Sequence, residues 1–349
     1  IFSYRPKKSV ITFGTKASVV NFDQTDLYTS KQYDRNFMNW NPQASYQYNF
    51  TTQKSFRLNY FGSTSQPNIS QIQPVRVNTD PLNITLGNPE LGPSFNNRFS
   101  IGYNSYKVIS DRNIYFNGSY SFTSNAIVNN TVTDQAGKST FQSINLGSKS
   151  PFNFYIYSNF SRKIPGTNLR AGLNVNVNGN TYYNMINNVL NKTQSETYTP
   201  RLTFSSYKAK KYDFYAGIGP SYSKSQSDLQ KNINNNGWTT DAYMEGNLYL
   251  PGKVKVGLSG SYFYQQKTQS FNEDFGRFLL NTTLTKSFMK DEGLKLQLSG
   301  NDLFNQNTGF SRRATSNMIT QNSYTTIRRY AMFSLIYDVS KMGGPQPKK

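Results

Sequence analysis

Apolar and polar residues alternate along several segments of this chain. In the stretch 169–178, Leu, Ala, Leu, Val and Val take every second position, and Arg, Gly and Asn stand between them. The alternation returns in 254–264 and 294–299. Because successive side chains of a β-strand point to opposite faces, each segment predicts a strand with one apolar and one polar face. The polar positions are too hydrophilic to pack on a second sheet, so we expect lipid on one face and water on the other.

Turn residues divide the chain into about fourteen such strands, with ends placed to within roughly two to four residues. The expected strands cover 8–21, 35–50, 54–63, 95–107, 113–127, 143–163, 168–181, 194–207, 211–225, 236–250, 253–267, 275–289, 294–304 and 325–340. Strands of this length and pattern predict an all-β fold, an antiparallel transmembrane β-barrel. We expect the barrel to occupy residues 1–342, and the Gly/Pro/Lys-rich segment 343–349 to be a disordered tail.

The connections between these strands alternate in length. Short ones are expected at 51–53, 165–167, 208–210, 251–252 and 291–293, and longer polar ones at 22–34, 64–94, 182–193, 226–235 and 305–324. Outer-membrane barrels have short periplasmic turns and long extracellular loops. The short connections therefore predict the periplasmic end, and both ends of an even-stranded barrel are expected there.

The composition agrees with a barrel and excludes a helical membrane protein. The 349 residues are 36% hydrophobic with a mean hydropathy of −0.66, and no run of about 18 apolar residues occurs. The 26 Tyr and 25 Phe suit the aromatic girdles at the two membrane interfaces. The alternative is a soluble β-sandwich or solenoid, because aromatic residues also favour ordinary strands.

The chain has no Cys and no His. Catalytic triads, thiolate metal sites and His-based zinc sites are therefore excluded. The adjacent acidic pairs at 273–274 and 291–292 lie where turns are expected, which favours solvated turn residues over an acid/base pair. We expect no catalytic residue, no metal site and no cofactor, and a protein that is not an enzyme.

The net charge of +20 raises the possibility of a nucleic-acid partner. Lys and Arg are spread along the sequence, however, without a basic helical stripe or an aromatic-basic nucleic-acid signature. We therefore expect no nucleic-acid partner. On a barrel, these residues would contact lipopolysaccharide phosphates at the outer rim, attract an anionic solute in the lumen, or simply form a solvated wall.

Three motifs resemble those of TonB-dependent receptor barrels, particularly the Bacteroidetes-type outer membrane protein β-barrel family. The first is the strand entry 40–48, and the last is the Asp-Leu-Phe-Asn motif before the final strand. Between them a strand at 56–60 leads into a proline-rich loop, which has Gln66 where the family has Arg and differs from it at 92–94. The positions that carry the loop and Asp-Leu-Phe-Asn motifs are Gln66, Pro67, Pro74, Gly87, Asn88, Pro89, Glu90, Asp302, Phe304 and Asn305.

We interpret these residues as structural. Proline has no amide proton, which suits an ordered loop that cannot join the strand ladder. Gly87 is expected to provide a bend that a side chain would forbid, and Asn88 to be extended because a proline follows it. Asp302 is expected to face the lumen near the outer rim. The sequence identifies no ligand-contacting residue.

The resemblance implies a 22-stranded barrel in the outer membrane of a Gram-negative bacterium, importing a bulky solute. Such receptors have an N-terminal plug that contacts TonB; neither is readable here, so we expect this chain to be the C-terminal part. The implied partners are outer-membrane lipid and lipopolysaccharide, the barrel-assembly machinery, TonB through the plug, and a surface lipoprotein. The alternatives are a complete fourteen-stranded passive channel, a surface adhesin or assembly barrel that uses its long loops, and a secreted basic binding module.

Overall fold

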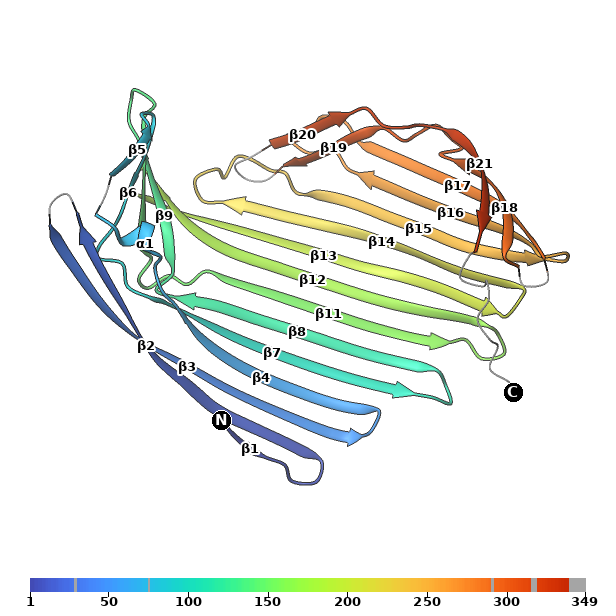
Figure 1. Ribbon diagram of the computed structural model, residues 1–349, viewed down its shortest axis with the longest axis horizontal. Coiled ribbons are helices and arrows are strands. Elements are labelled where there is room, and N and C mark those ends of the chain that lie inside the picture. The colour runs from blue at the N-terminus through green and yellow to red at the C-terminus, as the bar shows by residue number, and fades with distance from the viewer. Residues whose placement is uncertain (28–29, 75, 290–291, 315–318, 339–349) are drawn as a thin grey trace.

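The protein is described by a computed structural model, which covers residues 1–27, 30–74, 76–289, 292–314 and 319–338. One antiparallel wall dominates it, as part of a 19-stranded sheet (Figure 1). Among the described residues no helix has the length and apolar character needed to cross a membrane. The expected tail at 343–349 lies outside the described residues.

Fourteen of the described strands form the wall, and consecutive ones are antiparallel neighbours. They are β2 (Ser9–Asp26), β3 (Lys31–Thr51), β4 (Lys54–Ser65), β7 (Ser94–Lys107), β8 (Arg112–Ser124), β11 (Phe152–Lys163), β12 (Leu169–Ile186), β13 (Val189–Lys208), β14 (Tyr212–Ser227), β15 (Gly237–Leu250), β16 (Val254–Gln265), β17 (Phe275–Phe288), β18 (Leu294–Asn301) and β21 (Tyr330–Tyr337). The predicted antiparallel wall of about fourteen strands is confirmed.

The remaining elements lie beyond the wall. A short edge strand, β1 (Phe2–Tyr4), pairs with the start of β2. The other elements gather at the long-loop end: α1 (Ile69–Ile72), β5 (Arg76–Asp80), β6 (Asn83–Leu86), β9 (Ile127–Thr133), β10 (Ser139–Asn145), β19 (Gly309–Ala314) and β20 (Ile319–Tyr324) (Figure 1). The short turns lie at the opposite end, and the long connections predicted at 64–94, 226–235 and 305–324 are confirmed.

The wall is an open, curved sheet in which β2 and β21 are the two edges of the row (Figure 1). Within the described residues, β21 pairs only with β18, and β2 pairs only with β1 and β3. The short strand β1 covers β2 at 11–13 and leaves the rest of that edge without a strand partner in the described part of the chain.

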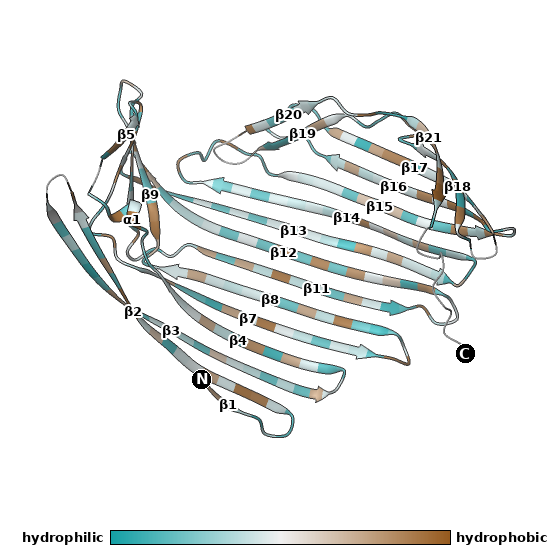
Figure 2. Cartoon of the chain, viewed as in Figure 1, coloured by the Kyte–Doolittle hydropathy of each residue, from teal (hydrophilic) through white to brown (hydrophobic). Residues whose placement is uncertain are grey.

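The two faces of the wall differ in polarity, as the alternation predicted. Leu173, Leu202 and Ile218 are register partners on β12, β13 and β14, and their side chains are 43%, 48% and 45% exposed. Leu298 and Phe333 repeat this arrangement on β18 and β21. Apolar and polar residues accordingly alternate along the strands in Figure 2. Exposed apolar rows on one face of a long wall are the surface that lipid covers.

Three predicted boundaries are wrong. The single strand expected at 143–163 is two strands, because the segment 146–151 contains Gly147 with a φ of +67° and then Pro151. The loop expected at 182–193 is a hairpin in which β12 and β13 meet at Asn187 and Asn188. Both asparagines have positive φ, as a two-residue hairpin turn requires. The loop expected at 22–34 is likewise mostly strand, because β2 and β3 stay paired as far as Asp26 and Lys31.

The assignment of faces predicts opposite outcomes for two neighbouring substitutions on β13. Leu202→Lys would place a charge among Leu173 and Ile218 and should lower the free energy of unfolding by about 2–4 kcal/mol near the bilayer midplane. Thr203→Lys should change it little, because Thr203 lies on the polar face between Gly172 and Gly217. Urea unfolding in lipid vesicles measures both, and equal losses would contradict the assignment.

The orientation predicts which cysteine is labelled on intact cells. Because the native chain has no Cys, each introduced thiol is the only one that this chain contributes. Ala136→Cys, in the turn between β9 and β10, should react with a membrane-impermeant maleimide. Thr52→Cys, in the short turn between β3 and β4, should react only after the outer membrane is opened. The reverse result would invert the orientation.

Candidate functional site

A small set of buried apolar side chains lies at the long-loop end of the wall. Pro67 and Leu91 are fully buried, and Ile72, Ile84 and Ala126 are 3–4% exposed. We call these five residues the mouth core. Apart from Phe271, they are all the fully or nearly fully buried apolar side chains among the described residues. The wall itself therefore contributes almost none of the chain's apolar core, and the proline-rich loop contributes most of it.

Polar contacts fix the loop around this core. The single-turn helix α1 begins with a capping box: the Asn68 side chain accepts the backbone amide of Gln71, and the Gln71 side chain accepts the backbone amide of Asn68. The Gln71 side chain also donates to the Ser143 hydroxyl at 3.3 Å, and the Asn88 side chain donates to the Ser143 carbonyl at 2.9 Å. The backbone amide of Gly92 donates to the Asn145 side chain at 2.8 Å. The loop is thereby joined to β10, 53 to 72 residues further along the chain.

Gly87 lies where the two halves of this loop cross. A Cβ there would overlap the carbonyl oxygen of Gln73. Gly87 is not among the residues with positive φ, so the requirement is steric. The adjacent Asn88 amide donates to the Gln71 carbonyl at 2.6 Å, which holds the crossing together. The close approach of Gln73 thus leaves no room for a side chain at Gly87.

Asp302 organises the Asp-Leu-Phe-Asn turn that follows β18. Its side chain is 5% exposed, and its carboxylate accepts the backbone amides of Gln306 and Asn307 at 2.8 and 2.9 Å. Its own amide donates to the Asn281 side chain at 2.9 Å, and its carbonyl accepts the Asn305 amide at 2.8 Å. Asp302 therefore has a structural role, because its carboxylate oxygens accept hydrogen bonds from the backbone of its own turn and do not point toward a solute.

The motif residues predicted from the sequence divide into two groups. Most of them meet at the mouth core or in the Asp302 turn. The exposed ones are Pro74, Glu90, Phe304 and Asn305. Gln66 is joined to the wall, since its side chain donates to the Asn39 side chain at 3.1 Å. Four further residues of this site are not predicted from the sequence: Ile84 and Ala126 in the mouth core, and the loop's hydrogen-bond partners Ser143 and Asn145. No local pattern marks them, because they reach the loop only through the fold.

The polar face of the wall carries a network of charged and aromatic side chains. Arg201 on β13 forms an ion pair with Asp241 on β15, and its guanidinium lies 5.4 Å from the centre of the Tyr243 ring. The Tyr243 hydroxyl donates to the Tyr215 hydroxyl at 2.8 Å. Gly217 lies beneath this ring, where a Cβ would be 2.6 Å from the Tyr243 hydroxyl oxygen. This network gives the inner surface fixed donors, acceptors and ring faces.

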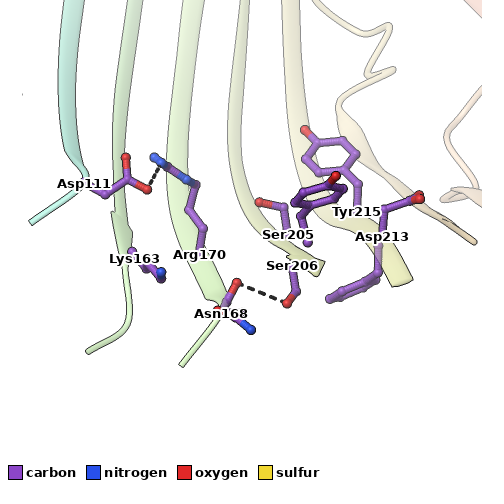
Figure 3. A pocket seen from close by; sticks show the side chains of 10 residues that line it. Asp111, Lys163, Asn168, Arg170, Ser205, Ser206, Asp213 and Tyr215 are labelled. Carbon is purple, nitrogen blue, oxygen red and sulfur yellow. Dashed lines mark hydrogen bonds and ion pairs between the residues drawn. The ribbon is translucent and has the colours of Figure 1, made fainter. Parts of the chain in front are cut away.

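A polar hollow of about 350 Å³ lies at the short-turn end of the same face (Figure 3). Asp111 and Arg170 form an ion pair at its side, and the hydrogen bond from Arg170 lowers the pKa of the Asp111 carboxyl below its ordinary value. The Ser206 hydroxyl donates to the Asn168 carbonyl at 3.1 Å. Across the described residues, no group of three or more acidic side chains is placed to hold a metal ion. The hollow thus presents a carboxylate, a guanidinium and hydroxyl groups at the short-turn end of the wall.

The comparisons with known proteins agree with this architecture at the level of the family. A model described as "Outer membrane protein beta-barrel family" matches residues 1–211 and 189–337. No curated protein matches the chain.

Two solved structures similar to the chain are a "TodX deltaS2S3 mutant monoaromatic hydrocarbon channel" and the "P. putida toluene transporter TodX". They are 10% and 11% identical, each with a TM-score of 0.30, 95% of this chain covered and 89% of the other. Likeness of this degree carries no conclusion about this chain.

The mouth core predicts a specific sensitivity to an added methyl group. Gly87→Ala should lower the free energy of unfolding by about 1–3 kcal/mol, because the backbone of Gln73 must move. It should also expose the loop to protease in intact cells. Gly92→Ala is the control, since a Cβ there would meet only ordinary contacts of 3.4 Å and more. Similar protease patterns for both variants would contradict the steric role of Gly87.

Proposed function

The chain belongs to the outer membrane protein beta-barrel family, and we propose that it forms the barrel wall of a TonB-dependent receptor that imports a bulky solute. The family places the protein in the outer membrane. Under this proposal the wall is a rigid conduit, the mouth captures the solute, and a plug pulled by TonB gates the lumen. The protein transports and does not catalyse.

The two open edges of the wall are the observation that carries this proposal. In lipid, every backbone amide and carbonyl needs a partner within the protein. Within the described residues, the first and last of the fourteen wall strands do not pair with each other. The backbone groups at these two edges therefore find partners only if further strands are present or if the wall rearranges. About eight further strands between β1 and β21 would complete the 22-stranded size of these receptors.

Features at both ends of the wall support the same proposal. The mouth core and the hydrogen bonds to β10 hold the loop between β4 and β7 in a fixed shape. The network around Arg201 leaves a lumen lined by polar and aromatic groups, which suits transient contacts with a hydrophilic solute. The partners we propose are TonB through the plug, the barrel-assembly machinery, lipopolysaccharide and a surface lipoprotein.

The proposal is tested by energy-dependent uptake in the native host. Cells with and without the intact gene are compared for accumulation of labelled oligosaccharides and peptides too large for general porins. Gene-dependent uptake should disappear when the proton-motive force is collapsed. Gene-dependent uptake that continues without the proton-motive force would instead show a passive channel. Adhesion to a surface without any gene-dependent uptake would show an adhesin.

Barrel size is tested separately by disulfide formation between the two edges. Phe333→Cys is combined in turn with Thr15→Cys, Ala17→Cys and Val19→Cys in the full-length protein. No pair should form a disulfide if further strands separate β2 from β21. Leu298→Cys with Phe333→Cys is the control that should react, because these residues are register partners. An efficient disulfide between β2 and β21 would show a closed fourteen-stranded channel.

A further inference from the structure

The fold gathers the positive charge of this chain at the short-turn end of the wall. The described residues of this rim carry sixteen Lys or Arg and three acidic residues. The rim consists of the turns and strand ends at 5–8, 51–54, 107–112, 162–170, 208–213, 250–255 and 286–295. The long-loop end holds most of the acidic residues and is much closer to neutral. We call the short-turn end the basic rim.

Three basic residues of this rim are aligned across neighbouring strands on the lipid-facing side. Lys107 on β7 is the register partner of Arg112 on β8, and Arg112 is the register partner of Arg162 on β11. Two residues into the membrane from this row, Ile114 and Phe160 are partners on the apolar face. Side chains two positions apart on a strand share a face. The row therefore lies on the outer surface, directly below the apolar band.

This arrangement is unfavourable without an anion. Like charges directly opposite each other on a sheet destabilise it. Within the described residues, the side chains of Lys107, Arg112 and Arg162 form no ion pair or hydrogen bond, and the Nε atom of Arg112 is buried without a partner. The nearest carboxylate along the chain, Asp111, is already paired with Arg170 on the polar face. The row thus places three positive charges side by side without a counter-charge of their own, which an outside anion would supply.

The surroundings suit a ligand that is both anionic and apolar. A groove of about 590 Å³ runs between the β7–β8 and β11–β12 turns. Arg162, Ile109 and Ile164 line it together with Lys163 and Asp111, whose carboxylate is paired with Arg170. Ile109 is fully exposed and Ile164 is 39% exposed. Elsewhere on the rim, the Lys54 ammonium lies 4.5 Å from the centre of the Phe50 ring, an arrangement typical of side chains at a membrane interface.

We propose that Lys107, Arg112 and Arg162 bind the phosphate of an anionic phospholipid in the periplasmic leaflet of the outer membrane. Arginine side chains bind phosphate through paired N–H donors, and a lysine adds a third positive charge. The acyl chains of the lipid would then lie on Phe160 and Ile114. Lipopolysaccharide is not the ligand, because it occupies the outer leaflet at the long-loop end.

The test compares the full-length protein with Arg112→Gln/Arg162→Gln in bilayers of phosphatidylcholine alone and of phosphatidylcholine with phosphatidylglycerol. Native mass spectrometry counts the lipids retained by the protein. The wild type should retain phosphatidylglycerol over phosphatidylcholine by roughly tenfold, as expected when two basic side chains each strengthen binding several-fold. The double variant should lose most of this preference.

A second readout separates lipid binding from a merely structural role. In phosphatidylcholine alone, the urea midpoint of the double variant should equal or exceed that of the wild type, because repulsion between the two arginines is removed. With phosphatidylglycerol, it should fall below that of the wild type. A variant that is equally destabilised in both bilayers would overturn the proposal.

Lys210→Gln/Lys211→Gln is the matched control, since it removes the same charge from the rim without touching the aligned row. It should keep the preference for phosphatidylglycerol. Loss of that preference in this control would show general charge attraction and overturn the specific site. Retention of lipopolysaccharide that depends equally on Arg112 and Arg162 would overturn the choice of lipid.

Discussion

The need to pair every backbone amide in a medium without water determines most of this structure. It explains why the chain consists of long antiparallel strands, why its turns are tight at one end, and why its two open edges matter. The apolar residues that would form the interior of a soluble protein instead lie exposed on one face, as Leu202 and Leu298 do. Packing into a core is correspondingly confined to the mouth, where strands give way to loops and the polypeptide meets water again.

The sequence predicted the wall well, because a strand with lipid on one side and water on the other must alternate residue by residue. This rule does not depend on distant contacts, so the fourteen wall strands were placed from local pattern alone. It does not apply outside the bilayer, where the hairpin at Asn187 and Asn188 was mistaken for a loop. Polar strands that extend beyond the membrane look like loops, because neither face needs to be apolar.

The site and the charge were harder to predict, for different physical reasons. The loop residues Pro67 and Gly87 were identified by resemblance, but their partners Ser143 and Asn145 come from another hairpin and have no signature of their own. The lysines and arginines look scattered in the sequence, since each turn contributes only a few. Folding brings every second turn to the same rim and turns a dispersed charge into a concentrated one.

The contacts around the β12–β13 hairpin join separate parts of the mouth. The Asn187 side chain accepts the amide of Thr133 at 2.8 Å, and the Asn130 side chain donates to Asn188 at 2.7 Å. Because β9 is paired with β10, and β10 with β6, these bonds join the β12–β13 hairpin to the connections that precede β7 and β11. The other half of the mouth, between β14 and β21, is joined in the same way: the Asn234 amide donates to the Gln269 side chain at 2.6 Å, and the Arg312 guanidinium donates to the Gln265 side chain at 3.2 Å. The two halves of the mouth are therefore each tied by contacts between segments far apart in the sequence.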